Sequence, residues 1–270
     1  MAKTLATHSR SPRGFTLVEL LVVIGIIALL AALVTPAVMQ AQVAARNAAI
    51  KAEIDMLHMA IMNYKNEYGS FPPAISGTST TDLAAKHILR IFPRTTLIAN
   101  EVTVPVTPLN SIYGWLSGYS SDPTAPVSAL NRQKLYDFDK SRLDSTGSIY
   151  YPSGKPGAPY IYINSSLYTS GSFPWPNSTF TYTAGANSTA YTIAAKTYAP
   201  IIKSGTYFNP DTFQILCAGR DEVFSEDTNL NNTLDAGEDV NSNGKLDLSD
   251  DDLSNFWPGT RKAYLDSLTQ

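Results

Sequence analysis

The sequence predicts an α+β protein in which one long N-terminal helix, apolar in its first half, packs on an antiparallel β-sheet. Three observations indicate this fold. Residues 15–36 form an almost unbroken apolar run, residues 50–68 carry an apolar stripe with helical spacing, and residues 148–219 contain short alternating segments rich in Tyr and Thr. A chain of 270 residues has room for one sizeable domain with appendages.

The first 14 residues form a polar leader with Lys3, Arg10 and Arg13 and no acidic residue. The run that follows is apolar except for Glu19 and two threonines, and about 20 such residues can cross a bilayer as a helix. The basic leader predicts a cytoplasmic N-terminus. A secretory signal is disfavoured because the helical pattern continues beyond residue 36. A plain membrane anchor leaves Glu19 unexplained, since an unpartnered carboxylate in the hydrocarbon costs at least about 2–3 kcal/mol.

Residues 37–69 are expected to continue the helix as an amphipathic segment. Its apolar positions alternate in spacing between four and three, which places them on one face: Ile50, Ile54, Leu57, Ile61, Tyr64 and Tyr68. The stripe lasts under three heptads, so packing on a domain is favoured over a coiled-coil seam. Gly69 and the following Phe71-Pro72-Pro73 predict that the helix spans residues 15–68.

Residues 70–220 are expected to form a β-rich globular domain. Residues 81–94 have the pattern of a short amphipathic helix, and residues 95–147 are expected to be loops and short strands. The strand candidates, separated by Pro and Gly, are residues 148–164, 178–184, 189–203 and 213–219. The single cysteine, Cys217, lies in the last of them and is interpreted as a small buried apolar residue.

Composition and motifs argue against enzymatic activity and nucleic-acid binding. The only histidines are His8, His58 and His87, and the chain has no nucleophile elbow, phosphate loop or metalloprotease motif. Nothing argues for an active site of carboxylates alone. Charged residues make up 16% of the chain, and the net charge of −3 gives no reason to expect a nucleic-acid partner.

The segment 221–252 holds 11 of the 23 acidic residues and one basic residue, Lys245. Residues 227–238 and 239–250 both follow the spacing of a 12-residue calcium loop, with oxygen ligands at positions 1, 3, 5, 9 and 12 and a backbone carbonyl at position 7. The first candidate set is Asp227, Asn229, Asn231, the Thr233 carbonyl, Asp235 and Glu238. The second is Asp239, Asn241, Asn243, the Lys245 carbonyl, Asp247 and Asp250.

A solvated acidic linker is the alternative interpretation of this segment. Calcium is favoured because both loops match at every ligand position and because Leu234 and Leu246 occupy the same apolar position in each. With no helix between the loops, the arrangement resembles compact thrombospondin-type calcium repeats. The sequence therefore predicts Ca²⁺ as a bound cofactor.

The N-terminal residues resemble a known family. Arg13-Gly14-Phe15-Thr16-Leu17-Val18-Glu19 resembles the cleavage and methylation motif of type IV prepilins and type II secretion pseudopilins, and Pro36 falls where many pilins carry a helix-bending proline. The resemblance implies a pilin-like fold, cleavage after Gly14 by a prepilin peptidase and N-methylation of Phe15. Glu19 would neutralise the Phe15 ammonium of a neighbouring subunit in the filament core.

Two further stretches, residues 64–72 and 213–224, resemble major pseudopilins, in which a calcium-bound loop follows the second stretch. The resemblance covers residues 10–73 and 213–252 and leaves 74–212 unmatched. It implies a structural subunit of a type II secretion pseudopilus or a related filament. The expected partners are other copies of the subunit, the prepilin peptidase and an inner-membrane assembly platform.

Two alternatives stay open: a type IV pilus subunit for adhesion or motility, and a membrane-anchored calcium-dependent binding module that never polymerises. The lack of a C-terminal cysteine pair favours the pseudopilin. The precursor is expected to span the inner membrane once and then to enter a filament in the periplasm or at the cell surface. The expected organisation is a leader (1–14), a membrane and filament-core helix (15–36), its continuation (37–69), the β-rich domain (70–220), the calcium loops (221–252) and a tail (253–270).

Overall fold

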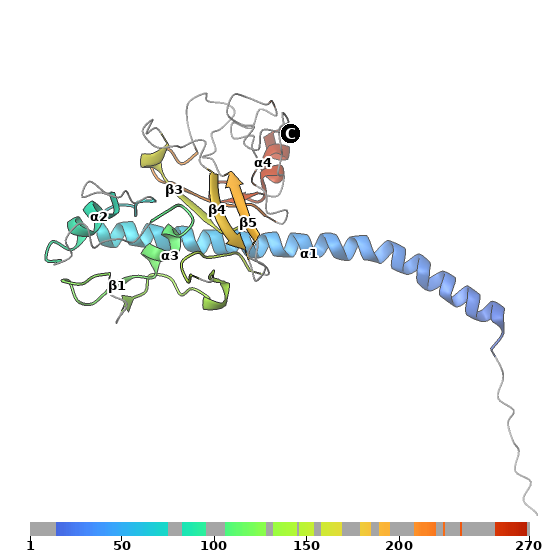
Figure 1. The fold of residues 1–270 in the computed structure, drawn as a ribbon. Helices are drawn as coiled ribbons and strands as arrows, with labels where there is room; N and C mark the ends of the chain where they lie inside the picture. Colours follow the sequence, from blue (N-terminus) through green and yellow to red (C-terminus); the bar gives the residue numbers. More distant parts are fainter. Residues whose placement is uncertain are drawn as a thin grey trace, which may run out of the picture. The chain divides into compact units, whose positions relative to one another are not determined.

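The computed structural model describes residues 15–74, 83–95, 106–127, 132–144, 146–153, 158–168, 179–184, 189–194, 208–219, 224, 233 and 252–268. The chain divides into two compact units, Met1–Ala45 and Arg46–Gln270, here called unit 1 and unit 2. Helix α1 (Leu17–Tyr68) contributes to both, and every other described element belongs to unit 2 (Figure 1).

Helix α1 confirms the predicted long N-terminal helix, with 52 residues. It continues through Pro36, which has no N–H to donate, and the Thr35 hydroxyl donates to the Ala31 carbonyl at 2.7 Å within the same turn. The helix ends at Gly69, whose N–H donates to the Lys65 carbonyl at 2.8 Å. Gly69 has a φ of +79°, a conformation that glycine adopts at little cost and that commonly ends helices.

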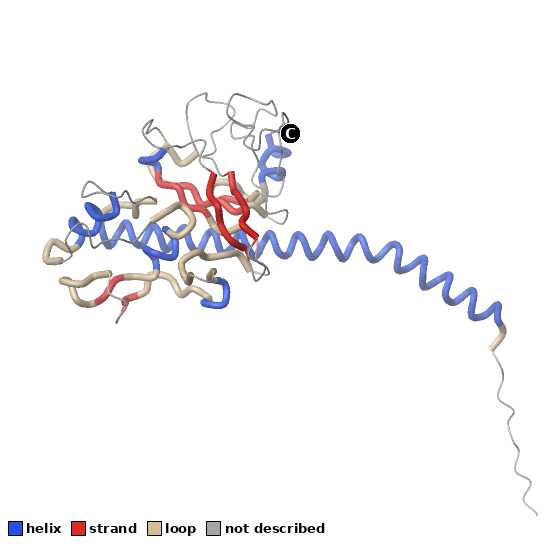
Figure 2. The backbone as a smooth tube through the Cα atoms, in the orientation of Figure 1, coloured by secondary structure: helices blue, strands red, loops and turns tan. Residues whose placement is uncertain are grey.

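The described strands form three antiparallel sheets, where the sequence pattern predicted one (Figure 2). Strands β1 (Tyr119–Ser120) and β2 (Arg132–Gln133) make the first, and β4 (Thr179–Ala184) and β5 (Thr189–Ala194) make the second. The third has the order β3 (Ile161–Asn164), β6 (Phe213–Cys217) and β7 (Leu253–Ser254).

Strand β3 is much shorter than the candidate at residues 148–164. The candidate contains Pro152, Pro156 and Pro159, and a proline cannot donate to a ladder of backbone hydrogen bonds. Among its described residues, only the last four pair with β6, while Tyr150 makes a single bridge with Leu143.

The remaining described helices are short. Helix α2 (Leu83–Ile91) confirms the predicted amphipathic helix, and 3-10 turns occur at Lys140–Arg142 (η1) and Ser165–Leu167 (η2). Helix α3 (Ser111–Leu116) corrects the expectation of loops and short strands for residues 95–147, because six residues are too few to show helical periodicity. The stretch expected as a tail contains β7 and helix α4 (Arg261–Leu268).

The apolar stripe of α1 forms the centre of the unit 2 core. Five of its six residues are at most 1% exposed: Ile50, Ile54, Leu57, Ile61 and Tyr64. The sixth, Tyr68, is half-buried. They belong to one cluster with the residues of β3 and β6. Strand β6 is buried at all five positions because it lies between β3 and β7, and Cys217 within it is 1% exposed, as interpreted from the sequence.

A buried carboxylate, Glu53, fixes α1 to the domain. It is 6% exposed and lies 2.5 Å from Nη2 of Arg142, while the hydroxyls of Tyr160 and Tyr150 donate to its two oxygens at 2.5 and 2.9 Å. Arg142 also donates to the Tyr151 carbonyl and lies 4.5 Å from the centre of the Tyr150 ring. Burial, with the nearby Glu53 charge, raises the pKa of Tyr150. These contacts define the Glu53 cluster: Glu53, Arg142, Tyr150 and Tyr160.

Replacing Glu53 by alanine leaves the Arg142 guanidinium and two tyrosine hydroxyls without their acceptor. We expect the free energy of unfolding to fall by about 3–5 kcal/mol, as when one partner of a buried pair is removed. Urea unfolding of the full chain in a nonionic detergent, followed by near-ultraviolet circular dichroism, measures this. Asp55→Ala is the control: it removes an exposed carboxylate paired with Lys51 and is expected to cost at most about 1 kcal/mol. If both variants lost the same free energy of unfolding, the Glu53 cluster would have no special role in stability.

Candidate assembly and metal sites

The first turn of α1 carries the predicted assembly residues. Phe15 is 78% exposed, Thr16 precedes the helix and Glu19 lies in its first turn, while Gly14 lies outside the described residues. The Thr16 N–H and hydroxyl both donate to Oε2 of Glu19 at 2.8 Å, and the Glu19 N–H donates back to the Thr16 hydroxyl at 3.2 Å. This reciprocal arrangement is a capping box.

The capping box shows what Glu19 does within a single chain. It holds the carboxylate at the start of α1, where the partial positive charge of the helix N-terminus favours an anion. This contact was not among the sequence predictions, although the Thr-x-x-Glu spacing before an apolar run is its known signal. The pairing of Glu19 with a neighbouring Phe15 stays a prediction.

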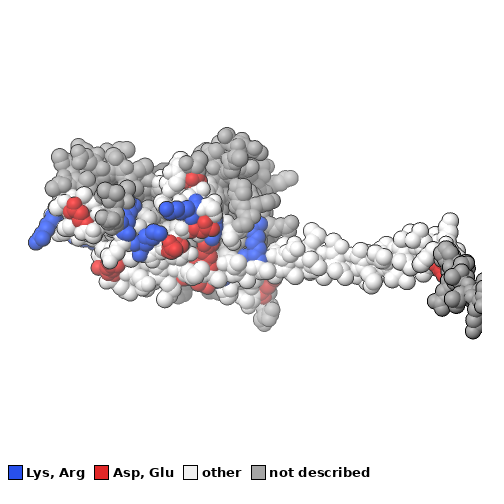
Figure 3. Space-filling model, turned by 90° about the horizontal axis from the view of Figure 1, so that it is seen from below, with Lys and Arg blue, Asp and Glu red and all other residues white. Residues whose placement is uncertain are grey.

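The apolar run of α1 is fully accessible in one chain. Every residue from 15 to 42 is exposed, and Figure 3 shows a corresponding stretch of surface with almost no charged side chains. In the part of the chain that the structure describes, α1 is the one helix long and apolar enough to cross a membrane. Pro36 lies inside this stretch and does not interrupt the helix.

A family model describing the prokaryotic N-terminal methylation motif matches residues 9–35. The match includes Gly14, Phe15 and Glu19 and most of the apolar run. No curated protein and no solved structure matches the chain. The chain therefore carries the prepilin-type signature, as the sequence resemblance predicted. This signature supports a type IV pilin-like or pseudopilin subunit made as a membrane-anchored precursor.

The candidate calcium ligands between residues 227 and 250 lie outside the described residues, except for Thr233, which is exposed. Within the described ranges, no group of three or more His, Cys, Asp and Glu side chains is arranged to hold a metal ion. The calcium loops thus stay a prediction, and what the structure adds concerns the residues on either side of them.

Both ends of the acidic segment are attached to the core. Near its start, Phe224 is 4% exposed; its last residue, Asp252, and the following Leu253 are each 1% exposed. Strand β7, which follows the segment, pairs with β6, so that Ser254 lies opposite Leu216 and Leu253 opposite Cys217. The acidic segment therefore closes a loop between two adjacent strands.

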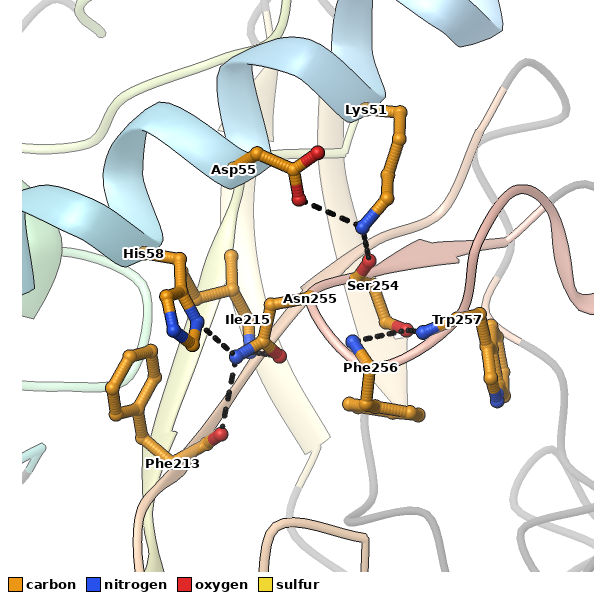
Figure 4. Close-up of polar contacts among 9 residues, drawn as sticks. All are labelled: Lys51, Asp55, His58, Phe213, Ile215, Ser254, Asn255, Phe256 and Trp257. Atoms are coloured by element: carbon orange, nitrogen blue, oxygen red, sulfur yellow. Dashed lines mark hydrogen bonds and ion pairs between the residues drawn. The ribbon is translucent and has the colours of Figure 1, made fainter.

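Lys51 of α1 holds the chain where it returns from this loop (Figure 4). Its ammonium donates to the Ser254 carbonyl at 2.9 Å and to the Asp55 carboxylate at 2.8 Å. The Lys51 side chain is only 17% exposed, whereas that of Asp55 is 58% exposed. One side chain of the helix thus binds the backbone of β7.

Asn255 makes a second link between the returning chain, β6 and α1. Its side-chain oxygen accepts from the Ile215 N–H at 2.9 Å, and its amide nitrogen donates to His58 Nδ1 at 3.0 Å and the Phe213 carbonyl at 3.3 Å (Figure 4). Because an amide nitrogen only donates, Nδ1 of His58 is the acceptor and carries no proton. Burial lowers the pKa of His58, which favours the same neutral form. Lys51, His58, Ser254 and Asn255 are called the C-terminal anchor below.

The C-terminal anchor was not among the sequence predictions. Lys51, Asp55 and His58 are spaced four and three apart and so share a face of α1 beside the apolar stripe, which was a visible signal. Their partners were not predictable, because Asn255 lies 197 positions after His58 and no local pattern relates the two.

A buried polar network joins the end of α1 to α2. His87 Nε2 lies 2.7 Å from the Tyr64 hydroxyl, which lies 2.5 Å from the Tyr119 hydroxyl. Arg90 Nη2 lies 3.3 Å from His87 Nδ1. A guanidinium only donates, so Nδ1 accepts and the proton of the neutral ring sits on Nε2, donating to Tyr64. Burial, as the larger cause, and the nearby Arg90 charge, as the smaller one, lower the pKa of His87 to about 4.

This network predicts a stability that depends on pH. The unfolded His87 titrates near pH 6.5 and the folded one near 4, so the unfolded state binds the extra proton between these values. Stability is therefore full above about pH 6.5 and falls as the pH drops towards 4, by an amount on the order of 3 kcal/mol from this residue. Urea unfolding at pH 7 and pH 4.5 measures the change.

The matched variant is His87→Gln, whose amide can donate to Tyr64 and accept from Arg90 but does not titrate. Between pH 7 and pH 4.5 it should lose about 2–3 kcal/mol less stability than the wild type. A variant that loses as much as the wild type would show that His87 does not titrate with the shifted pKa.

Proposed function

We propose that this protein is a structural subunit of a type II secretion pseudopilus or a related type IV pilus-like filament, cut after Gly14 and N-methylated at Phe15. The observation that carries the proposal is the prepilin-type signature at residues 9–35, placed at the start of a long helix. The signature is common to both filament types, and the single cysteine of the chain favours the pseudopilus. On this proposal the function is assembly and not catalysis.

The exposed apolar residues of α1 support packing between subunits. In unit 2, the face of α1 opposite the buried stripe continues the apolar character of the N-terminal run: Ala49, Ala52, Met56 and Met59 are exposed and spaced three, four and three apart. Met56 and Met59 are 54% and 61% exposed. A helix that is apolar here as well as along its first half fits contact with the helices of neighbouring subunits.

The geometry of Glu19 is compatible with the proposed pairing. Both Thr16 bonds go to Oε2, and within the described residues Oε1 has no hydrogen-bond partner. A carboxylate can accept on both oxygens, so Oε1 is available to the methylated ammonium of a neighbouring Phe15 while the capping box stays intact. The pair would neutralise two charges that are costly to bury alone in a filament core.

We further propose that calcium binding to the two loops at residues 227–250 orders the acidic segment after export. Six carboxylates in these 24 residues repel one another without a cation. Because the segment joins β6 to β7, metal binding would also stabilise β7 and the C-terminal anchor. The buried attachment of both ends supports this link.

The first prediction of the proposal concerns processing. When the chain is produced with a prepilin peptidase, mass spectrometry of the mature protein should find N-methyl-Phe15 at its N-terminus. Gly14→Val should block the cut, because the peptidase needs an unhindered backbone there. Gly25→Ala is the control and should be processed normally, since an added Cβ meets nothing within 4 Å. An uncut wild-type chain would favour the anchored module that never polymerises.

The second prediction concerns assembly. Glu19→Ala should be processed but should form filaments at least about tenfold less abundantly, because the Phe15 ammonium is left unpaired in the core. The control is Glu67→Ala, an exposed carboxylate near the other end of α1. Sheared filaments are quantified by immunoblot and electron microscopy. Assembly of Glu19→Ala at the wild-type level would reject the pairing.

The third prediction concerns the metal. Millimolar calcium should raise the melting temperature of the full chain in a nonionic detergent by several degrees, about the effect of 1–3 kcal/mol for a domain of this size. Asp239→Asn with Asp247→Asn should remove most of the rise, and Asp137→Asn with Asp266→Asn, at two exposed acids elsewhere, should not. If calcium did not change the melting temperature of the wild type, the proposal that the two loops bind calcium would be wrong.

A further inference from the structure

A groove with a basic wall lies beside the C-terminal end of α1, between helix α2, residues 70–73 and the junction of β3 with η2. Its cavity is about 420 Å³, within the range of roughly 300–1,000 Å³ typical of small-molecule sites. The described polar residues that line it are Ser70, Lys86, His87, Arg90, Asn164 and Ser166. We call it the basic groove.

No described carboxylate compensates the charge of this groove. Lys86 and Arg90 line it, and among its described lining residues there is no carboxylate. Neither cation forms an ion pair with any residue that the structure describes. Both lie on the same face of α2, four residues apart, where two like charges weaken a helix by a few tenths of a kcal/mol. An anion between them would remove this repulsion.

Arg90 is held in place at the groove. Its guanidinium donates to the Ser70 hydroxyl and to the lone pair of His87 Nδ1, and both acceptors are neutral. The other ring nitrogen of His87 is hydrogen-bonded to the Tyr64 hydroxyl. The Arg90 guanidinium is therefore oriented by the buried His87, which Tyr64 holds in place. Five N–H donors belong to a guanidinium, and these two contacts leave others for a ligand. A preoriented Arg loses less conformational entropy when it binds an oxyanion.

The opposite wall is also rigid and polar. The amide nitrogen of Asn164 donates to the Pro72 carbonyl at 3.0 Å, and its oxygen accepts from the Ser166 N–H at 3.0 Å. Phe71 supplies an apolar part of the lining and packs edge-on against Phe213 with ring centroids 5.2 Å apart. The groove thus combines the oriented Arg90 with a second cation, Lys86, with hydroxyl groups and with an apolar surface. Together these suit a polar ring with one anionic group.

We propose that the basic groove binds a monosaccharide-sized ligand that carries an oxyanion, with the oxyanion between Lys86 and Arg90. The oxyanion is a carboxylate in an acidic sugar or a phosphate in a phosphorylated one, and the chemistry of recognition is the same. Among its described lining residues, none belongs to the acidic segment or to the apolar run of α1. The proposal is therefore independent of both calcium binding and filament assembly.

The test is a calorimetric titration of the full chain in a nonionic detergent with four probes: galacturonate, galactose, glucose 6-phosphate and inorganic phosphate. We expect saturable binding of an anionic sugar and at least about tenfold weaker binding of galactose, which lacks the charge-assisted contacts. If galacturonate binds more tightly, the oxyanion of the ligand is a carboxylate. If glucose 6-phosphate binds more tightly, it is a phosphate. If inorganic phosphate bound as tightly as either anionic sugar, the proposal that the ligand is the size of a monosaccharide would be wrong.

Variants locate the binding. Arg90→Gln and Lys86→Gln should each weaken it about tenfold, the effect of losing one charge-assisted hydrogen bond. Lys140→Gln removes an exposed cation that does not line the groove and should bind as the wild type does. Near-ultraviolet circular dichroism checks that each variant is folded, and the titrations are repeated in a calcium chelator, which should change nothing. The proposal is overturned if neither anionic sugar binds, or if Arg90→Gln with Lys86→Gln binds as tightly as the wild type.

Discussion

The buried stripe of helix α1, from Ile50 to Tyr64, is the surface on which unit 2 is built. Strands β3 and β6 and helices α2 and α3 all contribute to the cluster that covers it. The same helix must remain apolar and accessible along its first half if it is to enter a membrane and then a filament. These two demands explain why its charges are confined to the second half, on faces outside the stripe, with Glu19 as the exception.

Apolar packing alone does not determine how a helix is placed along a domain. The buried polar groups select one placement, because each of them needs a specific partner. Glu53 requires Arg142 and two tyrosines, and His87 requires Tyr64 on one nitrogen and Arg90 on the other. A shift of the helix by one residue would leave such groups buried without partners, at a cost of about 1–3 kcal/mol each. The core of unit 2 is thus defined by polar contacts at both ends of the stripe.

The proposed functions use separate parts of the chain that α1 joins. Residues 15–42 offer the accessible apolar surface for insertion and assembly. The acidic segment leaves and returns between β6 and β7, where the C-terminal anchor connects it to α1 through Lys51 and His58. The basic groove lies at the end of α1, and its described lining residues belong to neither of these parts. A metal-dependent change in the acidic segment would therefore reach the helix through few contacts.

The sequence by itself determined the features that depend on local spacing. The cleavage motif, the apolar run, the stripe and the end of α1 at Gly69 were all predictable, because each is a pattern among residues close in the chain. The capping box was equally local and was overlooked. Strand lengths were overestimated where prolines interrupt pairing, and α3 was too short to recognise. The calcium loops stay a prediction. Only the tertiary structure decided the partners of Glu53, Lys51 and His58 and the walls of the basic groove. These join residues about 75 to 200 positions apart, which no local periodicity relates.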